Sequence, residues 1–590
     1  MKSLIYRAKS LKQKKPLIFL LTAFVCLSSL AGQSQNTEQR VFEKGVVVSQ
    51  NKIASAAGAK ILSIGGNAVD AAITTAYTLG VVEPNGSGIG GGGFALVYLS
   101  KDKSLTAIDF RERAPAKINQ QDYQFMKGPK AGGIPGTVKG LEYLRTNFGT
   151  LDRETLLDEP FRLAAFGFPI NKTLKNAIER KKETLAEFSD SKNIFLPSTE
   201  VPALGGRIGD RLVQSDLAHT IKEIQINGSK GFYEGKLGDK ISQSLQAAGG
   251  IIDKQDLKNY QVYVHKPICG SYRNQYKVCS FPLPSSGGIC LLESLNILEN
   301  FPLQNLDYKS PERIHFLVEA LKFSFADRAS KLGDPKFNTI NEQALLSKRR
   351  AKEIAHIIKF SKLNIPSSQI PNLDKQLDNQ INNNSEKPET THFTVVDKEG
   401  NIVVITSSLN GALGSGFVIP GTGILLNNTL DDFSIVSESN QYGLLGNNLN
   451  APMPNKTPLS SMTPSIVFDQ NEMPILALGS PGGPTIISAV LNALLAYLDQ
   501  RMSITEAVSA GRVHHQWMPD VIFAERELID KDLQKTLKDK YGYSYPNKET
   551  NVWKQFYWSV QAAELDWENG TITGASDPRT ERGLVYETVR

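Results

Sequence analysis

Residues 389–410 read ETTHFTVVDKEGNIVVITSSLN. "TTHFTVVD" has the pattern of a strand, "DKEG" has the composition of a turn, and "NIVVITSSLN" returns as a second strand. A turn centred near position 398.5 predicts that Thr390 lies opposite Ser407. The hydroxyl groups of Thr406 and Ser408 then flank it. The stretch therefore predicts a β-hairpin that begins at a threonine and has hydroxyl partners across from it.

The segment before this hairpin has the composition of a linker. Residues 361–389 are rich in Asn, Gln, Ser and Pro and lack any helix or strand period, so we expect them to be mobile. If the bond before Thr390 breaks, the threonine gains an α-amine with a pKa of about 7.7 to 8.0, suited to act as base for its own hydroxyl. The layout fits an N-terminal nucleophile enzyme. A surface linker followed by an ordinary β-hairpin would account for the same pattern.

The rest of the chain alternates helices and strands in blocks. Helical patterns at 54–82 and 310–333 mix with strands at 93–100 and 104–112, and strands after the hairpin lead into a helix from 485 to about 500. Such blocks indicate a layered α+β fold. No internal repeat is visible.

Composition and charge exclude several classes of protein. The 590 residues are 40% hydrophobic and 21% charged, which excludes disorder and a fibrous repeat. The net charge is +6, but six of the 66 basic residues lie in the first 31 positions, where there is no acid, so the remaining bases and acids balance. A neutral body lacks the clustered basic excess that a nucleic-acid partner or an anionic membrane surface requires.

The N-terminus has the pattern of a secretory signal. A basic start leads into an apolar stretch at 17–30 and small residues around Ala31, which predicts a signal peptide over 1–31. The apolar stretch is shorter than the roughly 20 residues that a spanning helix needs. An uncleaved N-terminal anchor is the alternative. We expect an exported protein without a stable membrane span, located in the periplasm or outside the cell.

Two cysteines are placed symmetrically about a turn. Cys269 and Cys279 lie equally far from Asn274 in an alternating stretch, so they would face each other across a hairpin. They could form a disulfide in an oxidising compartment or pack as small hydrophobic residues, and the sequence leaves both open. Cys290 is expected to pack in a helix.

Two further motifs do not predict a cofactor or a metal. "GIGGGG" at 88–93 matches a dinucleotide fingerprint, but a helix precedes it and a strand follows, the reverse of the required order. We expect a tight turn packed against other backbone. His514 and His515 are adjacent, so their side chains diverge and cannot readily hold one ion.

Spaced motifs along the chain carry a family resemblance. They include "GGNAVDAAI", "GIGGGGF", "DFRERAP", "PLPSSGGI", "TTHFTVVDKEGNIV", "GILLNNTLDDFS", "PLSSMTPSIV" and "GSPGGPTII". From about Gly45 to Glu587 the chain resembles the γ-glutamyltranspeptidases, which are self-cleaving N-terminal nucleophile hydrolases. The resemblance implies an αββα four-layer sandwich. It also implies a cut between Glu389 and Thr390, which leaves a large subunit (32–389) and a small subunit (390–590) joined as a heterodimer.

The resemblance also implies roles for individual residues. Thr390 matches the family's nucleophile, Arg111 the arginine that binds the substrate α-carboxylate, and Asp432 the carboxylate that binds the α-ammonium. A planar guanidinium suits a carboxylate, and a carboxylate suits an ammonium. Three polar side chains match residues that hold the same end of the substrate: Asn410, Ser460 and Ser461. Gly482 and Gly483 match the pair whose backbone N–H groups form the oxyanion hole.

The chain departs from the family pattern in a few places. Ser408 stands where relatives commonly have a threonine that hydrogen-bonds the nucleophile. Thr429 replaces a glutamine common near the ammonium in bacterial relatives, and Thr457 replaces a basic residue. Residues 434–442 resemble a lid loop that is one residue shorter than usual, and Tyr442 matches the residue that would hold this loop closed.

The activity implied by the resemblance is acyl transfer without a cofactor. Thr390 would attack the γ-carbonyl of glutathione or another γ-glutamyl compound, and water, an amino acid or a dipeptide would take the glutamyl group. A cephalosporin or glutaryl acylase of the same fold is the first alternative, although its substrates lack the ammonium that Asp432 would bind. A binding protein that kept the fold and lost the chemistry is the second.

Overall fold

A computed structural model gives the fold of residues 42–119, 127–196, 208–370, 389–434, 439–546, 558–581 and 583–587. The signal peptide expected over 1–31 and most of the linker expected over 361–389 lie outside these residues. The expected lid loop is described only at its two ends, because 435–438 also lie outside.

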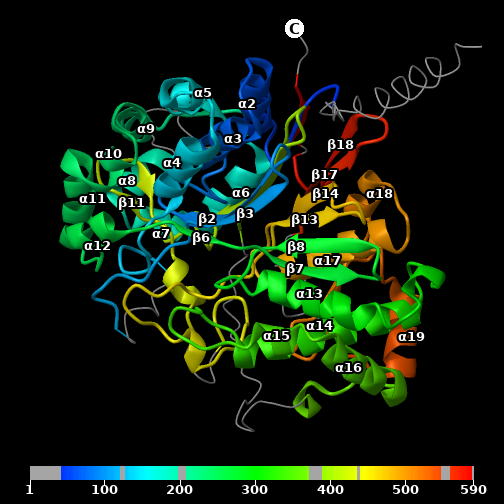
Figure 1. The fold of residues 1–590 in the computed structure, drawn as a ribbon. Coiled ribbons are helices and arrows are strands. Elements are labelled where there is room, and N and C mark those ends of the chain that lie inside the picture. The colour runs from blue at the N-terminus through cyan, green and yellow to red at the C-terminus, as the bar shows by residue number, and fades with distance from the viewer. Residues whose placement is uncertain are drawn as a thin grey trace, which may run out of the picture. The chain divides into compact units, whose positions relative to one another are not determined.

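Two antiparallel sheets form the middle of the structure (Figure 1). The first has the strand order β19 (Gly583–Tyr586), β1 (Val46–Ser49), β9 (Thr391–Val396), β10 (Ile402–Ser408), β2 (Gly92–Leu99), β3 (Ser104–Asp109) and β6 (Tyr263–His265). The second has the order β18 (Thr571–Ser576), β17 (Gln561–Asp566), β14 (Pro474–Gly479), β13 (Ser465–Phe468), β8 (Tyr276–Ser280) and β7 (Ile268–Tyr272). Three two-stranded sheets lie outside them: β4 (Phe168–Pro169) with β5 (Arg211–Leu212), β11 (Val418–Ile419) with β12 (Ile424–Leu425), and β15 (Val513–His514) with β16 (Phe523–Ala524).

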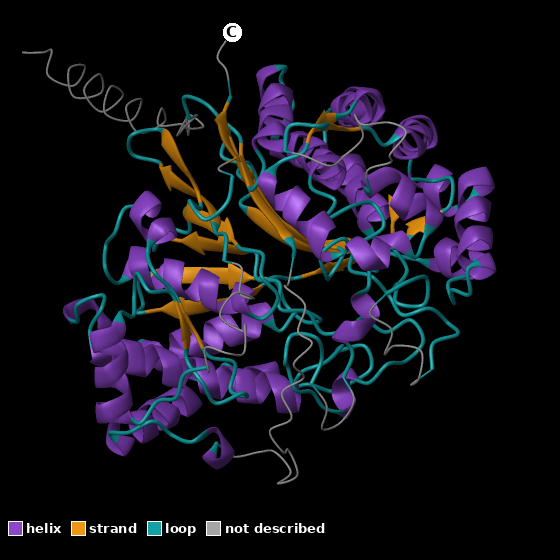
Figure 2. Cartoon of the chain, turned by 180° about the vertical axis from the view of Figure 1, so that it is seen from behind, coloured by secondary structure: helices purple, strands orange, loops and turns teal. Residues whose placement is uncertain are grey.

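Helices pack on the outer face of each sheet (Figure 2). On the first sheet lie α2 (Lys52–Ser63), α3 (Ala68–Val82), α4 (Thr137–Phe148), α5 (Arg153–Phe166), α6 (Lys172–Arg180), α7 (Lys182–Ala186), α8 (Ser189–Phe195), α9 (Ser215–Asn227), α10 (Ser229–Tyr233), α11 (Gly235–Ala247) and α12 (Lys254–Asn259). On the second lie α13 (Gly287–Leu298), α14 (Pro311–Lys331), α15 (Glu342–Leu345), α16 (Lys348–Ser361), α17 (Thr485–Leu498), α18 (Ile504–Ser509) and α19 (Lys531–Tyr541). Among the described residues, none of these helices is long and apolar enough to cross a membrane.

Three large buried clusters separate the layers. One lies between the first sheet and its helices, one between the second sheet and its helices, and a third, which includes Phe94, Val404, Phe281 and Ile466, lies between the two sheets. The alternation along β9 and β10 explains this order, since Phe393 and Ile405 belong to the helix-facing cluster while Val404 belongs to the inter-sheet cluster. The layers run helix, sheet, sheet, helix, so the expected αββα sandwich is confirmed.

The hairpin that follows Glu389 forms as predicted, but with its register shifted by one residue. Thr391 pairs with Ser407 and His392 with Thr406, so Thr390 comes to Ser408 and not to Ser407. The connection explains the shift. Gly400 adopts a positive φ of 79°, which adds a residue to the turn.

The glycine run packs against backbone, as the sequence indicated. A Cβ atom on Gly91 would lie 2.2 Å from the carbonyl oxygen of Ser408, and one on Gly93 would lie 2.4 Å from that of Thr406. Only glycine allows this approach, because any side chain would collide with the neighbouring strand. The run therefore seats β2 against the end of β10, where the hydroxyl partner of Thr390 lies.

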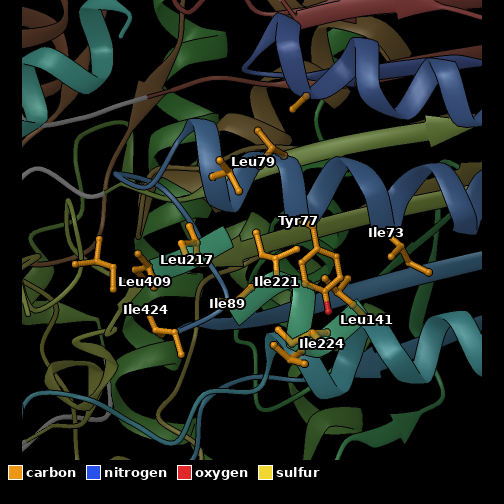
Figure 3. Close-up of a cluster of buried hydrophobic side chains, with 14 of the residues drawn as sticks. Ile73, Tyr77, Leu79, Ile89, Leu141, Leu217, Ile221, Ile224, Leu409 and Ile424 are labelled. Atoms are coloured by element: carbon orange, nitrogen blue, oxygen red, sulfur yellow. The ribbon is translucent and has the colours of Figure 1, made fainter. Parts of the chain in front are cut away.

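The first helix layer also supports the loop after β10. Figure 3 shows Ile73, Tyr77 and Leu79 of α3 packed in one buried cluster with side chains from α4 and α9. Leu409 and Ile89 belong to the same cluster. Because Leu409 lies between Ser408 and Asn410, its burial fixes the backbone that presents these two polar side chains.

The first residues of the expected mobile linker pack against the rest of the fold. Residues 361–370 are described and packed, so the prediction was wrong for this part. Ile365 and Ile370 are buried in the cluster beneath the second sheet. The Ser367 hydroxyl donates to the Trp517 carbonyl oxygen over 2.7 Å, and the Trp517 indole N–H donates to the Ser367 carbonyl oxygen over 3.0 Å. Ile365 and Ile370 make apolar contacts that the polar composition of this stretch did not indicate.

The two symmetric cysteines face each other in the second sheet. Cys269 of β7 lies directly opposite Cys279 of β8, and the two form a disulfide. β7 is the edge strand of this sheet, so the disulfide fastens an outer hairpin. Cys290 is buried in α13.

Candidate active site

One pocket contains nine of the ten expected catalytic and substrate-binding residues. They are Arg111, Thr390, Ser408, Asn410, Asp432, Tyr442, Ser460, Ser461 and Gly483. The tenth, Gly482, is adjacent to Gly483 in the chain. The space measures about 340 Å³ including its open mouth.

The Thr390 hydroxyl lies directly before β9, in a short hydrogen-bonded series. Its Oγ1 is 3.1 Å from Ser408 Oγ, and Ser408 Oγ lies 3.1 Å from the carbonyl oxygen of Glu389. The backbone N–H of Asn410 donates to Ser408 Oγ over 2.8 Å, which leaves the serine proton free to point elsewhere. Ser408 therefore contacts both the expected nucleophile and the carbonyl group of the bond before it.

Arg111 and Asp432 meet directly in the pocket. Arg111 Nη2 lies 2.5 Å from Asp432 Oδ2, and the two side chains are 2% and 11% exposed. Burial raises the pKa of Asp432. The backbone of Arg111 is fixed on both sides, because its N–H donates to Asp109 over 2.8 Å and its carbonyl oxygen accepts from the Tyr260 hydroxyl over 2.8 Å.

A second acidic residue lies behind this pair. Glu112 Oε2 is 3.6 Å from Arg111 Nε, and Glu112 Oε1 accepts from the Thr429 hydroxyl over 2.9 Å. Burial raises the pKa of Glu112. Thr429 thus bonds to Glu112 and is fully buried rather than part of the pocket wall. Thr457 also lies outside the wall, where its backbone N–H donates to Asp334 over 2.9 Å.

Asn410 is held in an uncommon conformation between two partners. Its φ of 78° lies in the left-handed region, which asparagine tolerates better than most residues. Its Nδ2 donates to the Asn428 carbonyl oxygen over 3.0 Å, and its Oδ1 accepts from the Tyr442 hydroxyl over 2.7 Å. Tyr442 therefore links the described segment from 439 onward to the loop that follows β10.

The serine pair reveals a pocket residue that the sequence had not indicated. Ser461 Oγ accepts from Arg328 Nη2 over 3.4 Å, while Arg328 Nε donates to Ser286 Oγ over 3.0 Å. Arg328 lines the pocket and is 6% exposed, and burial lowers its pKa. Within the described residues, no carboxylate lies within ion-pair distance of it. It belongs to the long helix α14, where its neighbours form no recognisable motif.

The two glycines lie just before α17. Gly482 and Gly483 have φ values of 129° and 57°, which other residues rarely adopt. In the part of the chain that the structure describes, neither backbone N–H donates a hydrogen bond. Free N–H groups beside a helix N-terminus can stabilise negative charge.

The histidine nearest in sequence to Thr390 is a packing residue. Burial lowers the pKa of His392 to about 3, so the ring is neutral at neutral pH. Its Nδ1 lies 2.8 Å from the Thr406 hydroxyl. Among the described residues, no group of three or more His, Cys, Asp or Glu side chains is placed to hold a metal ion.

Known proteins match this chain over nearly its whole length. A glutathione hydrolase proenzyme of Escherichia coli is 39% identical over 94% of both chains. One from Bacillus subtilis is 37% identical over 91% of this chain and 90% of its own. The crystal structure of a cephalosporin acylase from Bacillus halodurans superposes with a TM-score of 0.76 at 25% identity, covering 92% of this chain and 96% of that one.

The family model described as gamma-glutamyltranspeptidase matches residues 54–586. This range includes both sheets, apart from the first strand, and every residue of the pocket. The chain therefore belongs to the γ-glutamyltranspeptidase family.

Proposed function

We propose that this protein is a γ-glutamyltransferase and glutathione hydrolase whose nucleophile is Thr390. The observation that carries the proposal is the pair formed by Arg111 and Asp432 in the same pocket as Thr390. A γ-glutamyl donor carries an α-carboxylate and an α-ammonium on one carbon atom. Each charge of that zwitterion can replace one member of the pair, with the carboxylate on Arg111 and the ammonium on Asp432. Asn410, Ser460 and Ser461 supply neutral hydrogen bonds to the same end.

Maturation begins with attack of Thr390 on the bond before it. The Thr390 oxygen forms a bond to the Glu389 carbonyl carbon, the hydroxyl proton passes to Ser408 Oγ, and the Ser408 proton passes to the carbonyl oxygen. Both distances are 3.1 Å, so the series can carry the protons without a histidine. The C–N bond then breaks as the hydroxyl proton of the tetrahedral intermediate passes to the Thr390 nitrogen, which gives an ester and the free α-amine of Thr390. Water then hydrolyses the ester to the Glu389 carboxylic acid and the free Thr390 hydroxyl. The products span 32–389 and 390–590 if the signal peptide ends at Ala31.

Turnover uses the same hydroxyl group. The new α-amine of Thr390 takes its proton as Oγ1 attacks the donor's γ-carbonyl carbon. The N–H groups of Gly482 and Gly483 stabilise the oxyanion, and donors of this kind are typically worth about 3 to 4 kcal/mol each. The amine of the donor leaves with the proton, and water, an amino acid or a dipeptide then releases the glutamyl group.

We also place the mature protein outside the cytoplasm, in the periplasm or the extracellular space. The basic and apolar start of the sequence supports export. The Cys269–Cys279 disulfide supports an oxidising compartment.

The decisive experiment combines chain analysis with kinetics. N-terminal sequencing of the purified protein should give a small chain that starts at Thr390, and Thr390→Ala should remain uncut. The processed protein should hydrolyse glutathione, and glycylglycine should accelerate loss of the donor. A small chain with another N-terminus would overturn the assignment of the nucleophile. A single uncut band from the wild type would favour a binding protein.

An acylase for glutaryl or cephalosporin substrates is the second candidate, favoured by the fold shared with the Bacillus halodurans enzyme. Glutaryl groups lack the α-ammonium, so they leave Asp432 without a partner. Comparison of glutaryl and γ-glutamyl anilides separates the two activities. A preference for the glutaryl compound would identify an acylase.

A further inference from the structure

A second polar cluster surrounds the side chain of Glu389, apart from the substrate pocket. Glu389 Oε2 accepts from Asn85 Nδ2 over 2.5 Å, and Oε1 forms an ion pair with Arg180 Nη2. The Glu389 side chain is 7% exposed. Each carboxylate oxygen thus has its own donor. Asn85 comes from the loop between α3 and β2, and Arg180 is the last residue of α6.

Asn85 has no other use for its side chain within the described residues. It is 2% exposed, and its Oδ1 is buried without a hydrogen-bond partner. Burying an amide with one end unsatisfied is unfavourable, so such residues are usually retained for a specific contact. The only side-chain hydrogen bond of Asn85 in this part of the chain is to Glu389.

A second carboxyl group, that of Glu83, lies beside this cluster. Its Oε1 accepts from Gln50 over 2.5 Å and from the Thr391 hydroxyl over 3.2 Å. Burial and the nearby Glu389 raise the pKa of Glu83 to about 8, so Glu83 is mostly protonated at pH 7. In the described residues the Arg180 guanidinium pairs with the Glu389 carboxylate and not with Glu83.

The carbonyl group of Glu389 is held at the same time as its side chain. Ser408 bonds to the carbonyl oxygen, while Asn85 and Arg180 bind the carboxylate. Two anchors on one residue restrict rotation about its backbone. The carbonyl carbon is then presented to Thr390 Oγ1 in a fixed orientation, and fixed orientation accelerates an intramolecular attack.

We propose that Asn85 and Arg180 are positioning residues for self-cleavage, which recognise the acidic side chain of Glu389 before the bond is cut. The proposal rests on the proposed cleavage before Thr390. It makes the side chain at 389 a determinant of maturation and assigns Asn85 and Arg180 no role in the turnover of γ-glutamyl donors. Neither residue lines the pocket.

The test follows cleavage of newly synthesised chains by gel electrophoresis in a cell-free translation reaction. Asn85→Ala, Arg180→Ala and Glu389→Ala should each cleave about tenfold more slowly or worse, as expected when a charge-assisted hydrogen bond is lost from the transition state. Arg180→Lys should recover part of the rate. Arg180→Ala combined with Glu389→Ala should be no slower than the slower single variant, because the two side chains form one contact. Arg145→Ala removes an ion pair with Glu142 in α4 and serves as the matched control.

The same samples separate positioning from folding and from the proposed function. Once cut, Arg180→Ala should show wild-type kcat/KM for a γ-glutamyl anilide, and its thermal midpoint should match that of Arg145→Ala. Cleavage of Asn85→Ala and Arg180→Ala at the wild-type rate would overturn the inference alone. A wild-type small chain that does not begin at Thr390 would overturn the proposed cleavage and this inference together.

Discussion

Arg111 Nη2 and Asp432 Oδ2 lie 2.5 Å apart in a pocket where both side chains are almost fully buried. Each charge compensates the other while the pocket holds no substrate. Removal of one partner of a buried pair typically costs about 2 to 5 kcal/mol, because the remaining charge stays desolvated and unpaired. The same two side chains therefore stabilise the pocket and, in the proposed function, determine which substrates it binds.

Arg111→Ala and Asp432→Ala should both lose most of their kcat/KM for γ-glutamyl donors. Both should still self-cleave, because the proposed cleavage uses only Thr390, Ser408 and the surroundings of Glu389. Asp432→Ala should also lose most of its preference for γ-glutamyl over glutaryl anilides, as only the former carries an ammonium. If this variant discriminates as well as the wild type does, Asp432 does not bind the ammonium.

The disulfide between Cys269 and Cys279 should stabilise the chain without affecting turnover. The two residues are 10 positions apart, and the chain-entropy estimate for a loop of this size is about 3 kcal/mol. Cys269→Ala with Cys279→Ala should lower the urea midpoint and leave kcat/KM unchanged, since neither residue lines the pocket. Dithiothreitol should lower the midpoint of the wild type and leave that of the double variant unchanged. Equal urea midpoints for the wild type and the double variant in the absence of reductant would contradict the prediction.

Glu83 should make stability depend on pH. Its pKa is about 8 in the folded chain against a usual value of 4.5, so the folded state keeps a proton that the unfolded state has lost. This contribution to the free energy of unfolding is complete below about pH 4.5 and is lost as the pH rises through 8, at up to about 1.4 kcal/mol per pH unit.

Glu83→Gln keeps the oxygen that accepts from Gln50 and Thr391 but cannot ionise. Urea unfolding of uncut Thr390→Ala, with and without Glu83→Gln, isolates the effect. The glutamine variant should gain stability relative to its parent between pH 5 and 8. Parallel pH profiles would show that Glu83 is ionised in the folded chain.

The sequence predicted the hairpin and its threonine because alternation over a few residues is a local property. It missed the register by one position, since a positive φ at Gly400 is decided by the turn and not by the strand pattern. It also extended the linker too far, because the burial of Ile365 and Ile370 depends on partners distant in the chain.

The residues of the site also differ in whether the sequence could reveal them. Arg111, Asp432 and Gly483 were expected only through the family resemblance, as nothing near them in the sequence marks them as neighbours of Thr390. Arg328 and Asn85 were not expected at all. Each makes its contacts where segments far apart in the chain approach each other, which no spacing of residues reveals.

We expect Arg328 to lower the stability of the fold and to raise the activity of the enzyme. Its guanidinium is buried without a carboxylate partner in the described residues, and burial lowers its pKa, the sign of an unfavourable environment for the charge. Burying a charge is costly unless it is paired, and Arg328 forms no ion pair within the described residues, although the Asp432 carboxylate attracts its charge. Arg328→Met should therefore raise the thermal midpoint or leave it unchanged.

The same substitution should weaken donor binding. Ser461 Oγ accepts from Arg328, so the serine proton is free to donate to the donor's carboxylate, and the guanidinium adds a second positive charge near that carboxylate. Arg328→Met should lower kcat/KM by about tenfold or more, mostly through KM, because a hydrogen bond to a charged group is worth about 1.5 to 3 kcal/mol. Arg328→Lys should recover part of the loss. Lys331→Met, one turn along α14, is the control. A variant that loses stability and kcat/KM together would show that Arg328 is structural, whereas a higher midpoint with a higher KM requires that the enzyme keeps this buried charge for its substrate.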